Sequence, residues 1–235
     1  MNTPVDVEIS DGIARVTLNS GKVNELSMET FAALNAALDE AAALGAVVIL
    51  TGQPGMFSGG YDLKVMRSGP EAAAELVTTG STFSRRLLSH PHPVIAACSG
   101  HAIANGAFIL LSTDYRIGVD GDFKIGLNET AIGMTMHHVG IELSRARLTP
   151  AAFNRAVLNA EMFDPTAAVT AGFLDRVVSP DALADASSKV AEEMLKLNLV
   201  AHRHTKLKAR KQLLDTLAAA IKNDHGQILL GSEFR

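Results

Sequence analysis

FSGGYDL, residues Phe57 to Leu63, follows a continuous apolar run, Ala46–Thr51, that is typical of a strand buried on both faces. Its adjacent glycines, Gly59 and Gly60, let the backbone turn sharply and come close to a ligand. The N–H groups beyond such a turn are free to point at a negative oxygen. On this stretch alone, a glycine-rich loop without a function is still the favoured interpretation.

A second turn of the same kind strengthens the functional interpretation. GHAIANGAF, residues Gly100 to Phe108, follows the short apolar strand expected at Val94–Cys98 and runs into an apolar helix. Helix N-termini carry unpaired N–H donors and partial positive charge. Two such turns on neighbouring strands can each donate one N–H to the same oxygen, which is the geometry of an oxyanion hole.

Strand and helix patterns alternate on both sides of these turns. Residues 5–18 predict a β-hairpin with a turn at Asp11-Gly12. Ser27 is placed to cap a helix, and residues 70–89 predict another. The alternation continues to about residue 178, after which the chain is predicted to be helical to about residue 222. Alternating units of this kind favour an α/β fold.

The composition excludes several classes of protein. The chain has 235 residues, 47% hydrophobic and 20% charged, with a net charge of −4, which does not fit a disordered chain or a nucleic-acid binder. A single cysteine, Cys98, excludes a disulfide framework and a cysteine-rich zinc site. Apolar runs such as Ala107–Leu111 are far shorter than the ~20 residues that span a membrane. The first eight residues are polar, so we expect a cytoplasmic protein without a membrane segment.

Four segments together resemble one family. FSGGYDL resembles the F-[SC]-[AG]-G-x-D-[LI] signature of the crotonase superfamily, also called the enoyl-CoA hydratase/isomerase family. The second turn resembles its N-G-x-A-x-G-G-G signature, and Thr113–Ile117 resembles its C-D-x-x-[IV] strand. Ala171–Val178 resembles its A-x-x-x-G-L-V-x-x-V segment, so the resemblance covers about residues 5 to 200 in the same order and spacing.

The resemblance implies an architecture and a substrate class. It implies an α/β fold with a crotonase-like β/α spiral (ββα superhelix) core over residues 1–180. Residues 181–235 would be a C-terminal helical region used in trimerisation and forming part of the CoA site. The expected partners are an acyl-CoA thioester and further copies of the chain, as a homotrimer or a dimer of trimers.

Site residues carry over by position. The backbone N–H groups of Tyr61 and Asn105 would form the oxyanion hole for the thioester oxygen. The residues expected to bind CoA lie in the first turn and just after it: Ser58, Gly59, Gly60, Asp62, Leu63 and Lys64. Asn105 stands where the family usually has glycine. Its N–H can still donate, but its side chain adds bulk beside the thioester.

The carboxylates decide which reaction the resemblance implies. Hydratases of the family hold water with two glutamates, and the first position is occupied here by Phe108, which cannot ionise. Glu129 matches the second, within a run, IGLNETAIG, that closely resembles the mitochondrial Δ3,Δ2-enoyl-CoA isomerases. One base can take a proton from C2 and return it to C4, so a single carboxylate suffices for isomerisation. We therefore expect Glu129 in apolar surroundings with a raised pKa.

Simpler interpretations stand beside these. Judged by residue type alone, Glu129 would be a solvated or capping carboxylate, and Phe108 would be ordinary core packing. His137 and His138 are adjacent, so they would point in different directions, and no other ligand follows at metal-binding spacing. We expect no metal and no cofactor, with Phe108, Met136 and His137 lining the acyl pocket.

A basic patch lies on the helix predicted from residue 200. The patch consists of His202, Arg203, His204, Lys206, Lys208, Arg210 and Lys211. Such a patch is usually a solvated face, although in an acyl-CoA enzyme it could meet the CoA phosphates.

The sequence thus predicts an acyl-CoA isomerase that moves a double bond from C3 to C2. Two alternatives remain: another reaction of the family, such as weak hydratase or thioester hydrolase activity, and a non-catalytic acyl-CoA-binding trimer.

Overall fold

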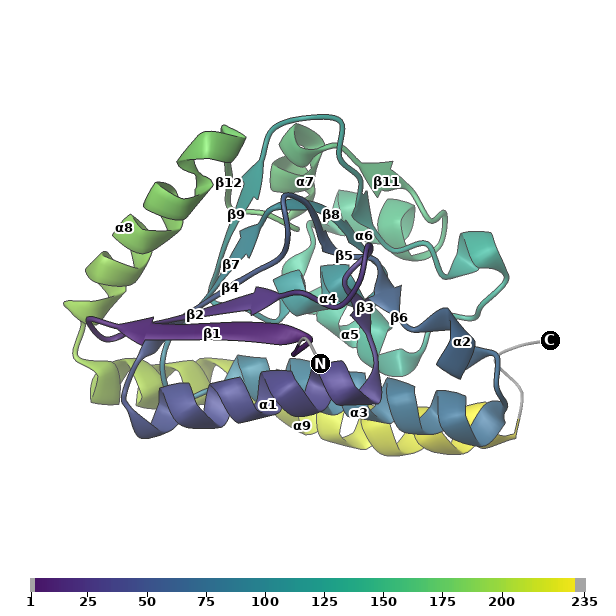
Figure 1. Cartoon of the computed structure of the whole chain (residues 1–235). Coiled ribbons are helices and arrows are strands. Elements are labelled where there is room, and N and C mark those ends of the chain that lie inside the picture. The colour runs from purple at the N-terminus through teal and green to yellow at the C-terminus, as the bar shows by residue number, and fades with distance from the viewer. Residues whose placement is uncertain (1–2, 231–235) are drawn as a thin grey trace.

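Six strands form the larger sheet of the protein, whose computed structural model describes residues 3–230 (Figure 1). In spatial order they are β1 (Val5–Ser10), β2 (Ile13–Leu18), β4 (Val47–Thr51), β7 (Val94–Cys98), β9 (Tyr115–Val119) and β12 (Arg176–Val178). The predicted hairpin β1–β2 is confirmed and is antiparallel, whereas the other pairs are parallel. Its turn residues Asp11 and Gly12 both have positive φ, as a two-residue hairpin turn requires.

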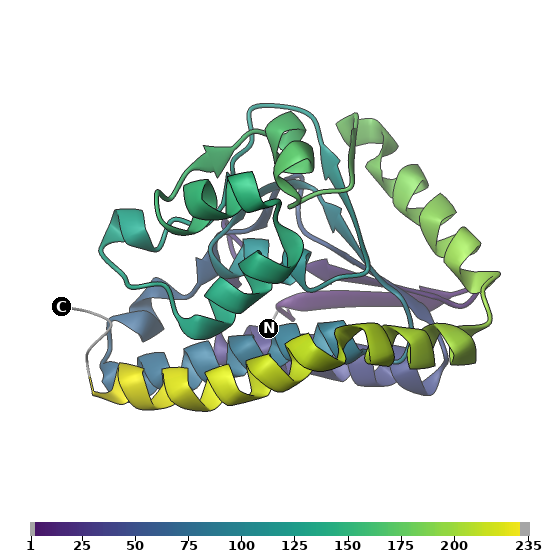
Figure 2. The same cartoon turned by 180° about the vertical axis from the view of Figure 1, so that it is seen from behind.

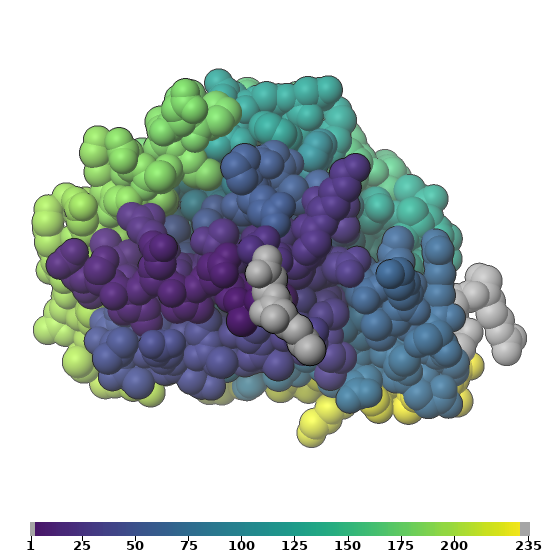
Figure 3. All heavy atoms as spheres, viewed as in Figure 1, coloured from purple at the N-terminus to yellow at the C-terminus, as the bar shows by residue number. Residues whose placement is uncertain are grey.

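The central strands of this sheet are buried on both faces. In β4, Val48 and Leu50 belong to the larger hydrophobic core, and Val47 and Ile49 belong to a second cluster on the opposite face. This two-sided burial explains why β4 reads as a continuous apolar run. Strand β1 lies at the edge and is mostly exposed, on the face shown in Figure 3.

Helices cover both faces of the sheet (Figures 1 and 2). The larger core lies beneath α1 (Met28–Ala43), α3 (Pro70–Ser89) and α9 (Leu199–Leu229). The second cluster lies beneath α8 (Leu183–Leu195), which follows a 3-10 turn at Pro180–Ala182. The fold class predicted from the sequence, a crotonase-like α/β spiral, is confirmed by this arrangement and by the structural neighbours reported below.

A smaller sheet lies where the sequence predicted turns. It contains β11 (Met162–Phe163), β10 (Ile125–Gly126), β8 (Gly100–Ile103) and β5 (Gly55–Ser58), and a separate pair joins β3 (Glu25–Leu26) to β6 (Gly60–Tyr61). The glycines explain the difference. A Cβ on Gly100 would lie 2.0 Å from the carbonyl carbon of Gly55, so glycine serves there for close strand pairing rather than for a turn.

Several further helices complete the fold, among them the apolar helix predicted after the second turn. They are α2 (Leu63–Met66), α4 (Asn105–Leu111), a 3-10 turn at Thr130–Ile132, α5 (His138–Arg147), α6 (Pro150–Val157) and α7 (Pro165–Ala171). Ser27 caps α1 as predicted, because its hydroxyl accepts from the N–H of Thr30 at 3.1 Å.

The last helix differs from its predicted length. Helix α9 continues seven residues beyond the predicted end at residue 222 and packs along α3 and α5 (Figure 2). The division at residue 180 stays a prediction, and the outer ends of its two ranges, residues 1–2 and 231–235, lie outside the described residues. Within residues 3–230, no helix is long and apolar enough to cross a membrane.

Candidate active site

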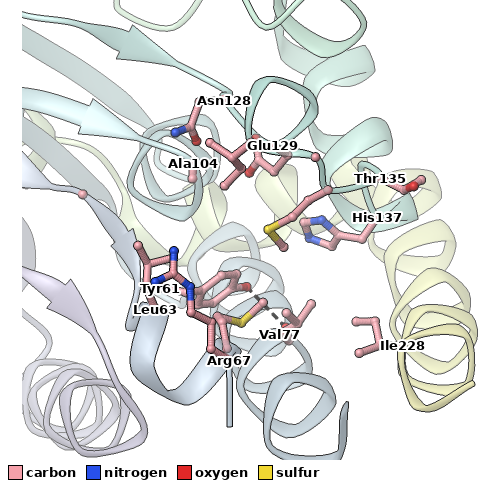
Figure 4. A pocket seen from close by; sticks show the side chains of 15 residues that line it. Tyr61, Leu63, Arg67, Val77, Ala104, Asn128, Glu129, Thr135, His137 and Ile228 are labelled. Atoms are coloured by element: carbon pink, nitrogen blue, oxygen red, sulfur yellow. Dashed lines mark hydrogen bonds between the residues drawn. The ribbon is translucent and has the colours of Figure 1, made fainter. Parts of the chain in front are cut away.

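A cavity of about 410 Å³ lies where β6, α2, α3, the segment 128–137 and the end of α9 meet (Figure 4). Its walls are largely apolar, formed by Leu63, Met66, Val77, Ile132, Met134 and Ile228. Glu129 is the one carboxylate among the described residues that line it. The cavity therefore combines a largely apolar wall with a few polar groups, as small-molecule sites usually do.

Hydrogen bonds of Ser58 and Asp62 hold the first glycine-rich turn in place. The Ser58 hydroxyl donates to the carbonyl of Asn24 at 2.8 Å and accepts from the N–H of Gly60 at 3.2 Å. Gly60 adopts a φ of +96°, which favours glycine. Asp62 then caps α2 by accepting from the N–H of Lys64 at 2.8 Å. Ser58, Gly60 and Asp62 thus shape the turn.

The second turn lies directly against the first. A Cβ placed on Gly60 would lie 3.4 Å from the backbone nitrogen of Asn105 and 3.1 Å from the Cβ of Ala104. Ala104 has a φ of +52°, a conformation that non-glycine residues rarely adopt and that marks a strained turn. Asn105 is the first residue of α4, so its N–H has no acceptor within the helix.

The Asn105 side chain takes a position that the sequence did not predict. Asn105 is 1% exposed and is not among the residues that line the cavity, whereas Tyr61 and Ala104 are. Its Nδ2 is buried without a hydrogen-bond partner. The sequence predicted that the Asn105 side chain would add bulk beside the thioester, but this side chain does not project into the cavity.

Glu129 lies on the segment between β10 and the 3-10 turn, and it faces the cavity (Figure 4). It is 7% exposed, and its Oε2 has no hydrogen-bond partner. Burial raises its pKa from 4.5 to about 7, and a hydrogen bond from its own backbone N–H partly opposes that rise. The expectation of a raised pKa in apolar surroundings is confirmed.

Phe108, which stands where the resemblance implies the first glutamate of a hydratase, lies behind the cavity wall. Its ring packs edge-on against His137, with centroids 5.3 Å apart. A Cβ on Gly140 would lie 2.6 Å from the Phe108 ring and 2.7 Å from the Met136 sulfur, so all three are tightly packed. Of the three predicted pocket residues, His137 lines the cavity, whereas Met136 lines a neighbouring hollow and Phe108 backs the wall.

Helix α9 is tied to this wall. The buried carboxylate of Asp224 accepts from the backbone N–H groups of His138 and Val139 at 2.8 and 3.0 Å and from the His138 ring at 2.7 Å. It thereby caps α5 from outside that helix. One turn further along α9, Ile228 reaches the cavity.

Some of the remaining residues predicted to bind CoA line the cavity and others do not. Gly59 and Leu63 line the cavity, whereas Lys64 is exposed beside it and is not among the lining residues. Lys206, from the predicted basic patch, is buried and pairs with Asp114 at 2.6 Å. It lies 22 residues from Ile228, about 33 Å along α9, so the patch does not reach this cavity within one chain.

Sequence reasoning missed most of the apolar wall. The missed residues come from four separate segments: Met66, Val77, Ile132 and Ile228. Each reads as an ordinary apolar residue of its own segment, and no local pattern brings them together. No group of three or more potential metal ligands occurs among residues 3–230.

A β/α core in which two glycine-rich strand ends meet at a cavity is the arrangement expected of the crotonase class of enzymes. The chain matches the family model described as enoyl-CoA hydratase/isomerase over residues 8–229. It therefore belongs to the enoyl-CoA hydratase/isomerase family.

Relatives within the family carry different names. The chain is similar to an enoyl-CoA hydratase/isomerase family protein from Pseudomonas syringae, at 61% identity and a TM-score of 0.95, covering 96% of this chain and 98% of that one. It is also similar to the human mitochondrial delta3-delta2-enoyl-CoA isomerase, at 29% identity and a TM-score of 0.89, covering 97% and 93%. A putative enoyl-CoA hydratase from Thermus thermophilus is 31% identical over 216 residues, 88% of this chain and 83% of the relative.

Proposed function

We propose that the protein is an enoyl-CoA isomerase that moves a double bond from C3 to C2 of an acyl-CoA thioester. The observation that carries the proposal is the single carboxylate of the cavity, Glu129, whose pKa of about 7 suits a base near neutral pH. The similarity to the human isomerase supports it.

The proposed reaction needs one base and one anion-binding site. The Glu129 carboxylate removes a proton from C2 of the 3-enoyl thioester, and the electron pair moves onto the thioester oxygen as a dienolate. The N–H groups of Tyr61 and Asn105 stabilise that oxygen. Glu129 then returns the proton at C4, which leaves the double bond between C2 and C3. Every step is a proton transfer, so the proposal requires neither a metal nor a cofactor.

Hydration is the second candidate, because curated relatives such as the Thermus thermophilus protein carry the name hydratase. Adding water requires a group that holds the water as well as one that delivers the proton. Phe108 provides no such group, and it lies behind His137 in a closely packed wall. This chemistry favours isomerisation over full hydratase activity.

The test is to incubate the protein separately with a 3-enoyl-CoA and a 2-enoyl-CoA. We expect conjugation absorbance to rise with the first substrate, and 3-hydroxyacyl-CoA to form slowly or not at all from the second. Hydration that outpaces isomerisation would establish the hydratase instead, and release of free CoA would establish a hydrolase. Tight acyl-CoA binding with no turnover would establish a binding protein.

The role of Glu129 is tested with Glu129→Gln, which removes the base and keeps the shape. We expect isomerisation to fall about 10²–10⁴-fold. An exposed glutamate on α3, Glu75, supplies the control Glu75→Gln, which should keep full activity. A folded Glu129→Gln variant with undiminished activity would refute the assignment.

We also propose that the chain assembles as a homotrimer or a dimer of trimers. Leu197, between α8 and α9, and Val200, in the first turn of α9, are 49% and 66% exposed, and a subunit contact would bury them. Sedimentation equilibrium measures the assembly directly, and a monomer at micromolar concentration would contradict it.

A further inference from the structure

The Tyr61 side chain reaches away from the oxyanion turn and enters a notch in helix α3. Its hydroxyl lies 3.4 Å from the carbonyl of Val77, and its ring lies 6.3 Å, centroid to centroid, from Phe31 of α1. The same ring lines the cavity (Figure 4). The residue whose backbone N–H is proposed to bind the thioester oxygen is therefore anchored through its side chain to two helices.

Gly80 makes that notch. A Cβ on Gly80 would lie 2.4 Å from the Tyr61 hydroxyl oxygen, 2.5 Å from Cε1 and 2.8 Å from Cζ. No real Cβ contact is that short, and a phenol ring cannot bend away as a flexible chain can. Any residue other than glycine at position 80 must therefore displace the Tyr61 ring, the helix, or both.

Glycine at position 80 lowers the stability of helix α3. It lies in the middle of the twenty-residue helix α3, where glycine is less favourable than alanine because of its backbone freedom. Nothing in the backbone of α3 requires glycine there, because Gly80 has an ordinary φ. The close approach of Tyr61 is the feature that explains the residue.

The Tyr61 ring supplies a second anchor for the turn, on the side away from Ser58 and β3. Gly59 and Gly60 precede Tyr61, and glycine has the widest backbone freedom of all residues. The Ser58 hydroxyl and the pairing of β6 with β3 restrain this backbone from one side. A ring that is wedged between α1 and α3 restrains the Tyr61 N–H from the other side, because the ring and the N–H share one Cα.

We propose that Gly80 is a positioning residue that seats the Tyr61 ring and thereby fixes the Tyr61 N–H in the oxyanion hole. This inference rests on the oxyanion hole of the proposed function. It concerns how that hole is held in place rather than which double bond moves. Gly80 itself touches neither substrate nor reacting atoms.

The first measurement does not depend on turnover. A cinnamoyl thioester of CoA absorbs at longer wavelength when donors polarise its carbonyl, so the red shift on binding reports the oxyanion hole. We expect the wild-type protein to give a red shift and Gly80→Ala to lose most of it while still binding the ligand. An undiminished red shift in Gly80→Ala, or none in the wild type, would overturn the inference.

The second measurement asks whether Gly80 acts through the ring. We expect Gly80→Ala to lower kcat for isomerisation about tenfold or more, with a smaller change in KM. In a Tyr61→Ala background, where no ring occupies the notch, Gly80→Ala should change kcat by less than about twofold. An equal loss in both backgrounds would mean that Gly80 serves only the helix. If Tyr61→Ala does not fold, the red shift of Gly80→Ala decides alone.

Gly226→Ala is the matched control. Gly226 also lies within a long helix, α9, but a Cβ there would meet nothing within 4 Å. This variant should keep both the red shift and kcat. If the wild type gives the red shift but isomerises no 3-enoyl-CoA, the proposed reaction is wrong. The red shift of Gly80→Ala then still decides whether Gly80 positions the Tyr61 N–H.

Discussion

Glu129→Gln is expected to stabilise the protein at alkaline pH while it removes activity. Folding raises the pKa of Glu129 from 4.5 to about 7, so the folded protein binds this proton more tightly than the unfolded chain. Below pH 4.5 the ionisation of Glu129 leaves the free energy of unfolding unchanged. Between pH 4.5 and pH 7 it lowers the free energy of unfolding progressively, and above pH 7 it causes no further change. A rise of this size corresponds to roughly 3 kcal/mol.

Glutamine carries no charge at any pH, so the variant avoids this cost. Between pH 5 and pH 8.5 we expect the wild type to lose about 2–3 kcal/mol more than Glu129→Gln does. Urea unfolding at these two pH values, followed by circular dichroism, measures the difference, with the exposed Glu75→Gln as a control that should track the wild type. Parallel stability curves for the wild type and Glu129→Gln would refute the assignment of a raised pKa.

Three further outcomes are expected. The kcat/KM of isomerisation should rise about tenfold between pH 6 and pH 8 and then level off, because Glu129 must be ionised to act; a pH-independent rate would exclude it as the base. Phe108→Ala should lower the free energy of unfolding by about 3–5 kcal/mol in urea, because the ring is 1% exposed and packs against His137; a loss below 1 kcal/mol would contradict that packing. Asp114→Ala leaves the buried Lys206 ammonium without its carboxylate and should cost about 3–5 kcal/mol in the same assay, whereas an unchanged midpoint would mean that the pair is solvated.

The parts of the fold that the sequence predicted are those with a local cause. The run Ala46–Thr51 is apolar at every buried position because both faces of β4 are covered. Ser27 begins its helix by a local hydrogen bond, and Pro70 begins its helix through its fixed φ. Glu129 was found through a motif, and its burial was expected from the chemistry that the motif implied.

The parts that the sequence did not predict depend on contacts between distant segments. Strands β5 and β8 contain glycines that signal turns, yet these glycines permit close pairing of two backbones 45 residues apart. Likewise, Gly80 reads as a weak point in a helix until the Tyr61 ring is seen against it. Ile228 lies almost a hundred residues from Glu129, and no pattern in either segment indicates that they share a cavity.

The contacts of Asp224 and Ile228, which join α9 to the cavity wall, have a consequence for synthesis of the protein. Both turns and Glu129 lie within the first 130 residues, whereas Asp224 and Ile228 leave the ribosome much later. Segments near the N-terminus are available to fold first during translation. A nascent chain that ends before α9 therefore contains both turns and Glu129 but lacks the Asp224 cap of α5 and the Ile228 part of the wall, so the cavity is completed only when the last helix is made.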